Sequence, residues 1–247
     1  MRARTLVPPF ALAALVAVSA CGATRSPESP PGEHVLSKAE ASTALLGLDD
    51  IGTGFKPDKD DSKGTSMGCL SDAQGGVTRG KAKPATKASQ IYLADTDVGL
   101  PSLFSGVAGF RDTAGARSAV EGVLSVLRRC TSLDETDHGF HYQLTISFDR
   151  DSSGPEVDEQ LNVSAVGTMS TQGMTVPMAV HFAVVRIGNA VEESGIATVS
   201  EDARADAAKL SKAAVARLAG VVGGRTVPRA GLHFDPVDIN DYLSSST

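Results

Sequence analysis

The stretch of sequence that decides the fold is Phe140-His141-Tyr142-Gln143-Leu144-Thr145-Ile146-Ser147-Phe148. Apolar and polar residues alternate along it, which is typical of a β-strand with one face buried. The alternation returns over residues 161–165, and residues 174–187 form a third, more apolar strand. A turn at residues 187–190 leads into a fourth strand that we expect to end near Val199. Four consecutive strands joined by short turns predict an antiparallel sheet.

Three helices are expected around these strands. Ser37 and Glu40 form a capping box that starts the first helix. Asp112 caps the second, whose apolar residues share one face and which ends at Cys130. Residues 200–220 show the third helical pattern. This order of elements predicts one α+β domain, with a mostly antiparallel sheet and helices packed on one face.

The first 20 residues have the pattern of a signal peptide. Arg2 and Arg4 precede an apolar stretch that ends in Val18-Ser19-Ala20-Cys21-Gly22. Small residues followed by a cysteine form a lipobox, which predicts cleavage before Cys21 and acyl chains such as palmitate on that residue. A transmembrane anchor is the alternative, but the stretch is shorter than the roughly 20 residues that a membrane-spanning helix needs.

The predicted mature chain has three parts. Residues 21–34 are rich in Pro, Ser and Gly and predict a lipidated, flexible tether. Residues 35–222 form the folded domain, and residues 223–247 are a tail in which Asp235 could cap a short docking helix. We therefore expect an extracytoplasmic domain held by lipid at the outer face of a bacterial cell membrane.

Charge and composition exclude some partners. The formal net charge is −6 and there is no Trp. Phosphate affinity comes from clustered Lys and Arg, so nucleic acid is not an expected partner. The lack of aromatic stacking platforms also weakens a sugar-binding interpretation.

Two cysteines remain once Cys21 is lipidated. Cys69 lies within residues 56–89, which are rich in Gly, Asp, Ser and Lys and predict an irregular segment. In an exported protein we expect Cys69 and Cys130 to form a disulfide, which would stabilise the fold by roughly 4 kcal/mol by closing a loop of about 60 residues. Zinc binding is the alternative, but no further ligands stand at metal spacing.

No motif supports catalysis, a cofactor or a metal site. The sequence has no G-x-S-x-G, S-x-x-K or H-E-x-x-H pattern, so we expect no enzymatic activity. His138 and His141 stand beside acidic residues, but on a strand they would point to opposite faces. We interpret them as a polar turn that leads into a strand.

A neutral polar face is the strongest candidate site. If the apolar residues of each strand face the helices, then His141, Gln143, Asn162 and His181 share the opposite face with several Ser and Thr residues. Solvated sheet faces usually mix Thr with charged residues, so this face fits a cleft for a small polar ligand. A simple solvated face is the alternative, because Thr is a good strand former.

Residues 110–130, together with Leu45-Leu46-Gly47-Leu48-Asp49-Asp50-Ile51 and Cys69, resemble the PknH-like extracellular sensor domain of actinobacteria. In that family a strand ending in Phe leads to an Ala-rich helix that closes on a disulfide cysteine. The resemblance spans roughly residues 34–222. It implies an antiparallel sheet with helices around a cleft for an unidentified ligand. The family commonly has a second disulfide, whereas no cysteine follows Cys130 here.

The resemblance implies a function for the folded part. Members occur as the outer domains of receptor Ser/Thr kinases and as free-standing lipoproteins, and this chain resembles the second kind because it has no kinase domain. The expected function is a membrane-anchored ligand-binding or sensor module. The alternative is a structural or partner-interaction lipoprotein of the cell envelope without a small-molecule ligand.

Overall fold

The structure is a computed structural model, and it describes residues 34–58, 67–79, 82–96, 99–151, 155–171, 173–200, 202–227 and 229–237. The predicted signal peptide, Cys21 and nearly all of the tether lie outside these residues, as does the end of the predicted tail. Those predictions concern residues outside the described part of the chain.

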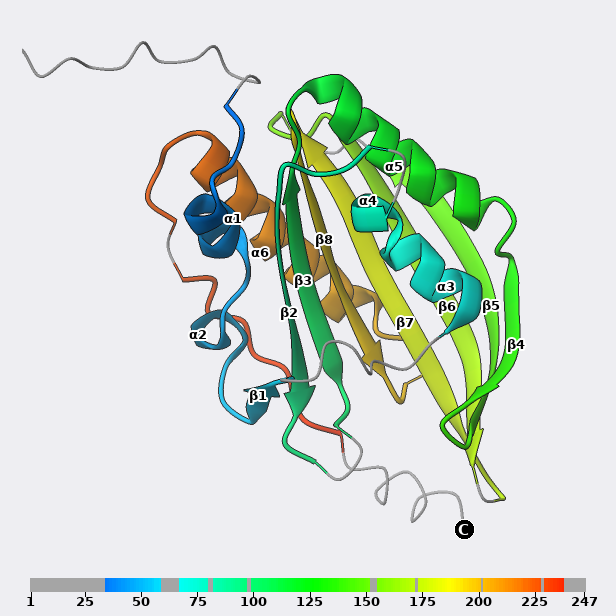
Figure 1. The fold of residues 1–247 in the computed structure, drawn as a ribbon. Coiled ribbons are helices and arrows are strands. Elements are labelled where there is room, and N and C mark those ends of the chain that lie inside the picture. Colours follow the sequence, from blue (N-terminus) through cyan, green and yellow to red (C-terminus); the bar gives the residue numbers. More distant parts are fainter. Residues whose placement is uncertain are drawn as a thin grey trace, which may run out of the picture.

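The described residues form one antiparallel sheet of eight strands with helices around it (Figure 1). The strand order is β1-β2-β3-β8-β7-β6-β5-β4, so the last strand in sequence lies in the middle of the sheet. The elements in chain order are α1 (Lys38–Ala44), α2 (Leu48–Ile51), β1 (Phe55–Pro57), α3 (Gly68–Gln74), α4 (Gly76–Arg79), β2 (Thr86–Ala94), β3 (Ser102–Gly109), α5 (Thr113–Leu127), β4 (Ser132–Asp137), β5 (Phe140–Asp151), β6 (Glu159–Thr171), β7 (Met174–Ile187), β8 (Ala190–Thr198) and α6 (Arg204–Val222).

The predicted α+β class and antiparallel sheet are confirmed, but the helices cover both faces of the sheet rather than one. The helices α3, α4 and α5 pack on one face, and α1 and α6 pack on the other (Figure 1). The physical reason lies in β7, where every residue from Met178 to Ile187 is buried. A strand that is apolar on both sides must be covered on both sides.

The face covered by α5, which we call the α5 face, holds the larger core. Phe110, Leu124 and Leu127 are each no more than 1% exposed there, and they pack with alternate residues of β5, β6 and β7. The predicted cap of α5 is confirmed, because Asp112 Oδ1 accepts a hydrogen bond of 2.7 Å from Gly115 N. This element follows the sequence pattern closely.

The opposite face, which we call the α6 face, is covered over its middle strands. The long helix α6 packs on β7 and β8, and α1 packs beside it on β2 and β3. The predicted capping box of α1 is confirmed, since Glu40 N donates to Ser37 Oγ at 3.2 Å and Ser37 N donates to Glu40 Oε2 at 2.7 Å. Neither helix reaches across the whole width of the sheet.

Two segments differ from the sequence-based expectation. Residues 56–89, predicted to be irregular, contain β1, α3, α4 and the start of β2. The edge strand β4 was not predicted, because Leu133 is its only apolar residue. It forms a hairpin with β5, in which His138 and Gly139 both have positive φ angles (51° and 84°), as a tight two-residue turn requires.

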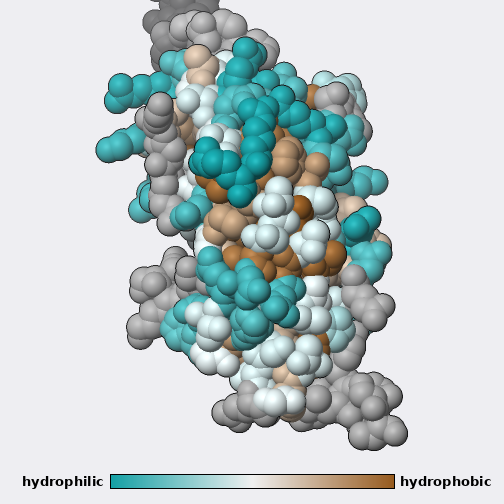
Figure 2. Space-filling model, turned by 90° about the vertical axis from the view of Figure 1, so that its right-hand side faces the viewer, coloured by the Kyte–Doolittle hydropathy of each residue, from teal (hydrophilic) through white to brown (hydrophobic). Residues whose placement is uncertain are grey.

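The side of the molecule next to the edge strand β4 carries both hydrophilic and hydrophobic residues. Hydrophilic residues surround a smaller hydrophobic area in its middle (Figure 2). The charged residues Asp134, Glu135 and Asp137 lie on β4 itself. Charges on an edge strand disfavour pairing with a second sheet edge.

The first part of the predicted tail packs on the domain, and the helix that Asp235 was expected to cap lies mostly outside the described residues. Residues 229–237 run in an extended path, and Phe234 is 3% exposed with its ring edge-to-face on Phe55 at 6.5 Å. Asp50 ties this segment to α6, because its carboxylate accepts hydrogen bonds from Ala230 N at 2.8 Å and from Arg217 at 3.0 and 3.1 Å. The segment therefore completes the core on the α6 face.

Candidate functional site

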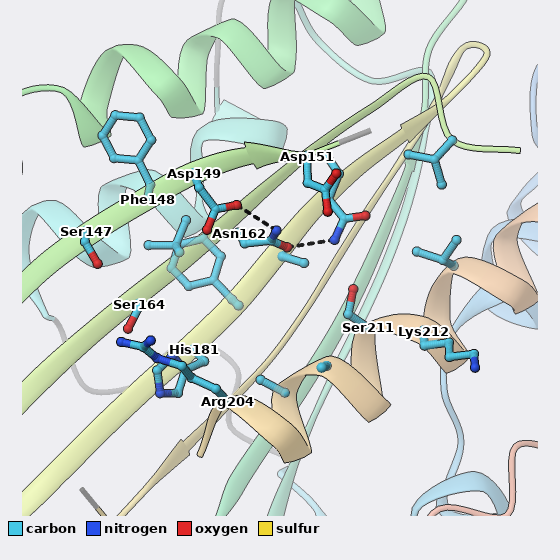
Figure 3. A pocket seen from close by; sticks show the side chains of 18 residues that line it. Ser147, Phe148, Asp149, Asp151, Asn162, Ser164, His181, Arg204, Ser211 and Lys212 are labelled. Atoms are coloured by element: carbon cyan, nitrogen blue, oxygen red, sulfur yellow. Dashed lines mark hydrogen bonds between the residues drawn. The ribbon is translucent and has the colours of Figure 1, made fainter. Parts of the chain in front are cut away.

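A groove lies on the α6 face, between α6 and the strands that α6 leaves uncovered. Its volume is about 590 Å³, which is within the range of small-molecule sites. Strands β5, β6 and β7 form its floor and α6 forms one wall (Figure 3). The polar residues that line it are Ser147, Asp149, Asp151, Gln160, Asn162, Ser164, His181, Arg204, Ser211 and Lys212. Phe148 of β5 also lines the groove, but its ring is directed toward α5 (Figure 3).

The strand register builds one end of the floor from three neighbouring polar residues. Ser147 pairs with Ser164, and Ser164 pairs with His181, so the three side chains form a row across β5, β6 and β7. His181 is only 3% exposed. Within the described part of the chain, His181 Nε2 and Ser164 Oγ are buried and have no hydrogen-bond partner. Such atoms lose free energy on burial unless a ligand or water satisfies them.

The charge state of His181 follows from its surroundings. Burial lowers the pKa of the imidazole, and the positive charge of Arg204 lowers it further, while Asp202 opposes them. The neutral ring is therefore favoured. A neutral imidazole can donate or accept through Nε2, depending on its tautomer.

The next row of the floor is held by hydrogen bonds between side chains. Gln160 Nε2 donates to Asn162 Oδ1 at 2.7 Å, and Asn162 Nδ2 donates to Asp149 Oδ1 at 2.9 Å (Figure 3). These bonds fix the orientation of the Asn162 amide and of the Asp149 carboxylate. The floor is thus organised in advance of any ligand.

Two of the four predicted ligand residues line the groove and two do not. All four share the α6 face, because the registers of β5, β6 and β7 place His141, Gln143, Asn162 and His181 on the same side. Asn162 and His181 line the groove. His141 and Gln143 lie nearer the other end of β5, where both contact Asp134 of β4, at 2.7 and 3.4 Å. Their hydrogen-bonding groups are engaged at the sheet edge.

The charged groove residues were missed by sequence reasoning. Asp149 and Asp151 continue the outward-facing positions of β5 beyond the neutral stretch, so the alternation itself could have indicated them. Arg204 could not have been found in that way, because it lies on α6 and only the packing of that helix brings it to the strands. The candidate site is therefore more charged than predicted.

A buried carboxyl group lies on the α6 face, outside the groove. Glu192 of β8 is 0% exposed, and its strand neighbours are Val107 and Val185. Burial raises the pKa of its carboxyl to about 8, and the nearby Ser194 hydroxyl offsets this only in part. Neither oxygen has a hydrogen-bond partner of good geometry among the described residues. The group is therefore neutral at pH 7.

The predicted disulfide is present. Cys69 of α3 and Cys130 after α5 are bonded, with an S–S distance of 2.06 Å and Cα atoms 5.8 Å apart. The bond ties the short helices to the end of α5 on the α5 face. Both thiols are consumed, so the alternative of zinc binding by these two residues does not apply.

Comparison with solved structures finds a relative in fold. No family model matches the sequence, and no curated protein matches it. The crystal structure of the extracellular domain of PknH from Mycobacterium tuberculosis is similar to the chain, with a TM-score of 0.56 and 17% sequence identity. The chain shares the fold of that extracellular domain. The match covers 78% of this chain and 100% of the other, and at this identity it establishes the fold alone.

The fold that the sequence resemblance implied is therefore confirmed, whereas the free-standing lipoprotein stays a prediction. Among the described residues, no helix is long and apolar enough to cross a membrane.

Proposed function

We propose that this protein is an extracytoplasmic sensor module that binds a small polar ligand in the groove between α6 and strands β5 to β7. The lipobox at Cys21 supports attachment to the outer face of the cell membrane. The protein acts by binding and carries out no catalysis, and it needs no cofactor. The similarity to the extracellular domain of PknH supports a sensor role.

One observation carries the ligand-binding part of the proposal. Ser164 Oγ and His181 Nε2 are buried without partners in the described part of the chain, and both side chains line a groove of about 590 Å³. An unpartnered buried polar group costs about 1–3 kcal/mol, so a fold keeps such groups where they serve a purpose. A ligand with matching polar groups recovers that free energy.

The membrane anchor is tested by Cys21→Ala. The variant lacks the thiol that carries the lipid, so we expect it in the soluble fraction, while the unmodified protein sediments with membranes. Fractionation and immunoblotting measure the distribution. Undiminished membrane retention of the variant would contradict the lipid anchor.

Ligand binding is tested by thermal unfolding of the protein with fractions of a cell-envelope extract. A ligand at 100 times its dissociation constant raises the free energy of unfolding by about 2.7 kcal/mol. We expect one fraction to stabilise the protein, and we expect Ser147→Trp to abolish the effect by filling the groove. Ser147 is exposed, so the larger side chain is compatible with the fold.

The matched control is Thr145→Trp. Thr145 is exposed on the same face of β5, two residues before Ser147, but does not line the groove. We expect this variant to keep the stabilisation. If no fraction stabilises the protein, or if both Trp variants respond as the unmodified protein does, a partner-interaction role without a small ligand replaces this proposal.

A further inference from the structure

The groove separates charges of opposite sign. Arg204, at the start of α6, reaches over the strands on the side of Ser164 and His181 (Figure 3). Asp149 and Asp151 project from β5 farther along the floor. Within the described residues, neither aspartate has an ion-pair partner, and Arg204 contacts only Asp202, at 3.9 Å. The charges on the two sides of the groove therefore do not neutralise one another.

One end of the groove is suited to an anionic group. Arg204 supplies a guanidinium group on a side chain that is 68% exposed, so the group can turn toward a ligand. Ser164 and His181 supply two buried polar atoms without partners beside it. Hydrogen bonds that involve an ionised group are stronger than neutral ones, and a guanidinium matches the geometry of a carboxylate. A carboxylate placed here would satisfy all three side chains.

The other end is suited to a cationic group. Asp149 uses Oδ1 to accept a hydrogen bond from Asn162, which leaves Oδ2 for a ligand. Asp151 lies on the same face of β5, two residues farther on. Neither carboxylate forms an ion pair among the described residues, although Lys212 also lines the groove, so an ammonium group of a ligand is favoured beside Asp149.

The spacing along the strands limits the length of the ligand. Asp149 and Asn162 form the row next to that of Ser147 and Ser164, two residues along each strand. Two residues of a strand cover about 6.6 Å. An extended dipeptide spans about 7 Å, whereas a single amino acid holds its charges at about half that distance. A dipeptide therefore matches the step from the row of Ser147 and Ser164 to Asp149, whereas Asp151 lies a further two residues along β5.

We propose that the groove binds a zwitterion of dipeptide length, with its carboxylate at Ser164, His181 and Arg204 and its ammonium group at Asp149. This inference rests on the proposed function and specifies the chemistry of the ligand. It requires the ligand to carry both charges. The inference also assigns each end of the groove to one of these two charges.

The experiment measures the affinity of the full chain for four probes by isothermal titration calorimetry. The probes are alanyl-alanine, its N-acetylated form, its C-terminal amide, and the form with both modifications. Each modification removes one charge and changes the size of the probe little. We expect alanyl-alanine to bind, and each single modification to weaken binding at least tenfold, because a charge-assisted hydrogen bond contributes about 1.5–3 kcal/mol.

Two variants test the assignment of the ends. Arg204→Gln should erase the preference for the free carboxylate over the amide and retain the preference for the free amine. Asp149→Asn should do the opposite. Arg229→Gln is the matched control, because Arg229 is an exposed arginine paired with Asp49 and lies outside the groove. A general disturbance of folding would not remove one preference and keep the other.

The possible outcomes separate this inference from the proposed function. Equal binding of all four probes, or no binding of alanyl-alanine up to millimolar concentration, overturns the zwitterion inference. The proposed function still stands in that case if an envelope fraction stabilises the protein and Ser147→Trp removes the effect. If neither the probes nor any fraction bind, both proposals fail.

Discussion

The two faces of the sheet are built from the same strands but differ in the size of their apolar clusters. The α5 face holds one continuous apolar cluster that includes the disulfide. The α6 face holds two smaller clusters, and between and beside them Glu192, Ser194 and His181 are buried with unpartnered atoms. The difference indicates that the α5 face provides most of the stability, while the α6 face keeps polar groups that folding alone would disfavour.

The largest effect should come from removing the disulfide of the α5 face. In Cys69→Ala/Cys130→Ala we expect the free energy of unfolding to fall by roughly 4 kcal/mol, since the bond joins residues 61 apart and restricts the unfolded chain. Urea denaturation measures the change. A reduced sample of the unmodified protein is the control and should behave like the variant. A loss below about 1 kcal/mol would show that the α5 face does not depend on this bond.

Truncation of aliphatic side chains compares the two faces directly. Leu124 of α5 is 1% exposed, so Leu124→Ala should reduce the free energy of unfolding by about 3 kcal/mol. Val215 of α6 borders the groove, where the space left by truncation opens toward solvent. Val215→Ala should therefore lower stability by about 1 kcal/mol. If urea denaturation shows equal losses of the free energy of unfolding for the two variants, the α5 face does not contribute more to stability than the α6 face.

A pH-dependent effect is expected at Glu192. Its raised pKa of about 8 means that the folded protein keeps a proton that the unfolded chain releases near 4.5. The destabilisation is therefore absent below pH 4.5, grows as the pH rises toward 8, and is constant above that. Glu192→Gln should stabilise the protein by roughly 2 kcal/mol at pH 8, less than the full shift implies because the amide also lacks partners.

The measurement is the free energy of unfolding of both proteins at pH 4.5 and pH 8. We expect no gain at the lower pH. Glu40 provides the control, because its pKa is lowered by the hydrogen bond from Ser37, so Glu40→Gln should destabilise near neutral pH instead. A gain for Glu192→Gln that does not vary with pH would mean that its carboxyl is not the cause.

A small gain in stability should come from the groove. Ser164 Oγ is buried without a partner among the described residues, so Ser164→Ala removes an uncompensated polar group and should raise the free energy of unfolding of the ligand-free protein by about 1 kcal/mol. Binding of the stabilising envelope fraction should nevertheless weaken. If Ser164→Ala lowers the free energy of unfolding but leaves binding of the envelope fraction unchanged, Ser164 has a structural role and does not contact the ligand.

The strands and the long helix α5 could be predicted because each depends on a local pattern. Alternation over residues 140–148 fixed the faces of β5, and Asp112 marked the start of α5. The edge strand β4 could not be predicted in this way, since a single apolar residue leaves no alternation. It is a strand because β5 supplies hydrogen bonds along its length.

The site was predictable only in part for the same reason. Strand period placed Asn162 and His181 on the correct face. It could not tell which part of that face remains open, because this depends on where α6 crosses the sheet. The helix covers β7 and β8, contributes Arg204 to the groove and leaves His141 at a distance. Such tertiary placement has no local signal.

The central position of β8 has a consequence for how the chain folds. Residues 102–109 pair with residues 190–197, so the sheet cannot be completed until nearly the whole domain is available. Until then β3 has one unpaired edge, and exposed strand edges promote aggregation. The disulfide does not bridge this gap, because it joins two elements of the α5 face that precede β4. Folding therefore depends on a late contact of high sequence separation, which makes it slow and exposes the unfinished sheet to misassembly.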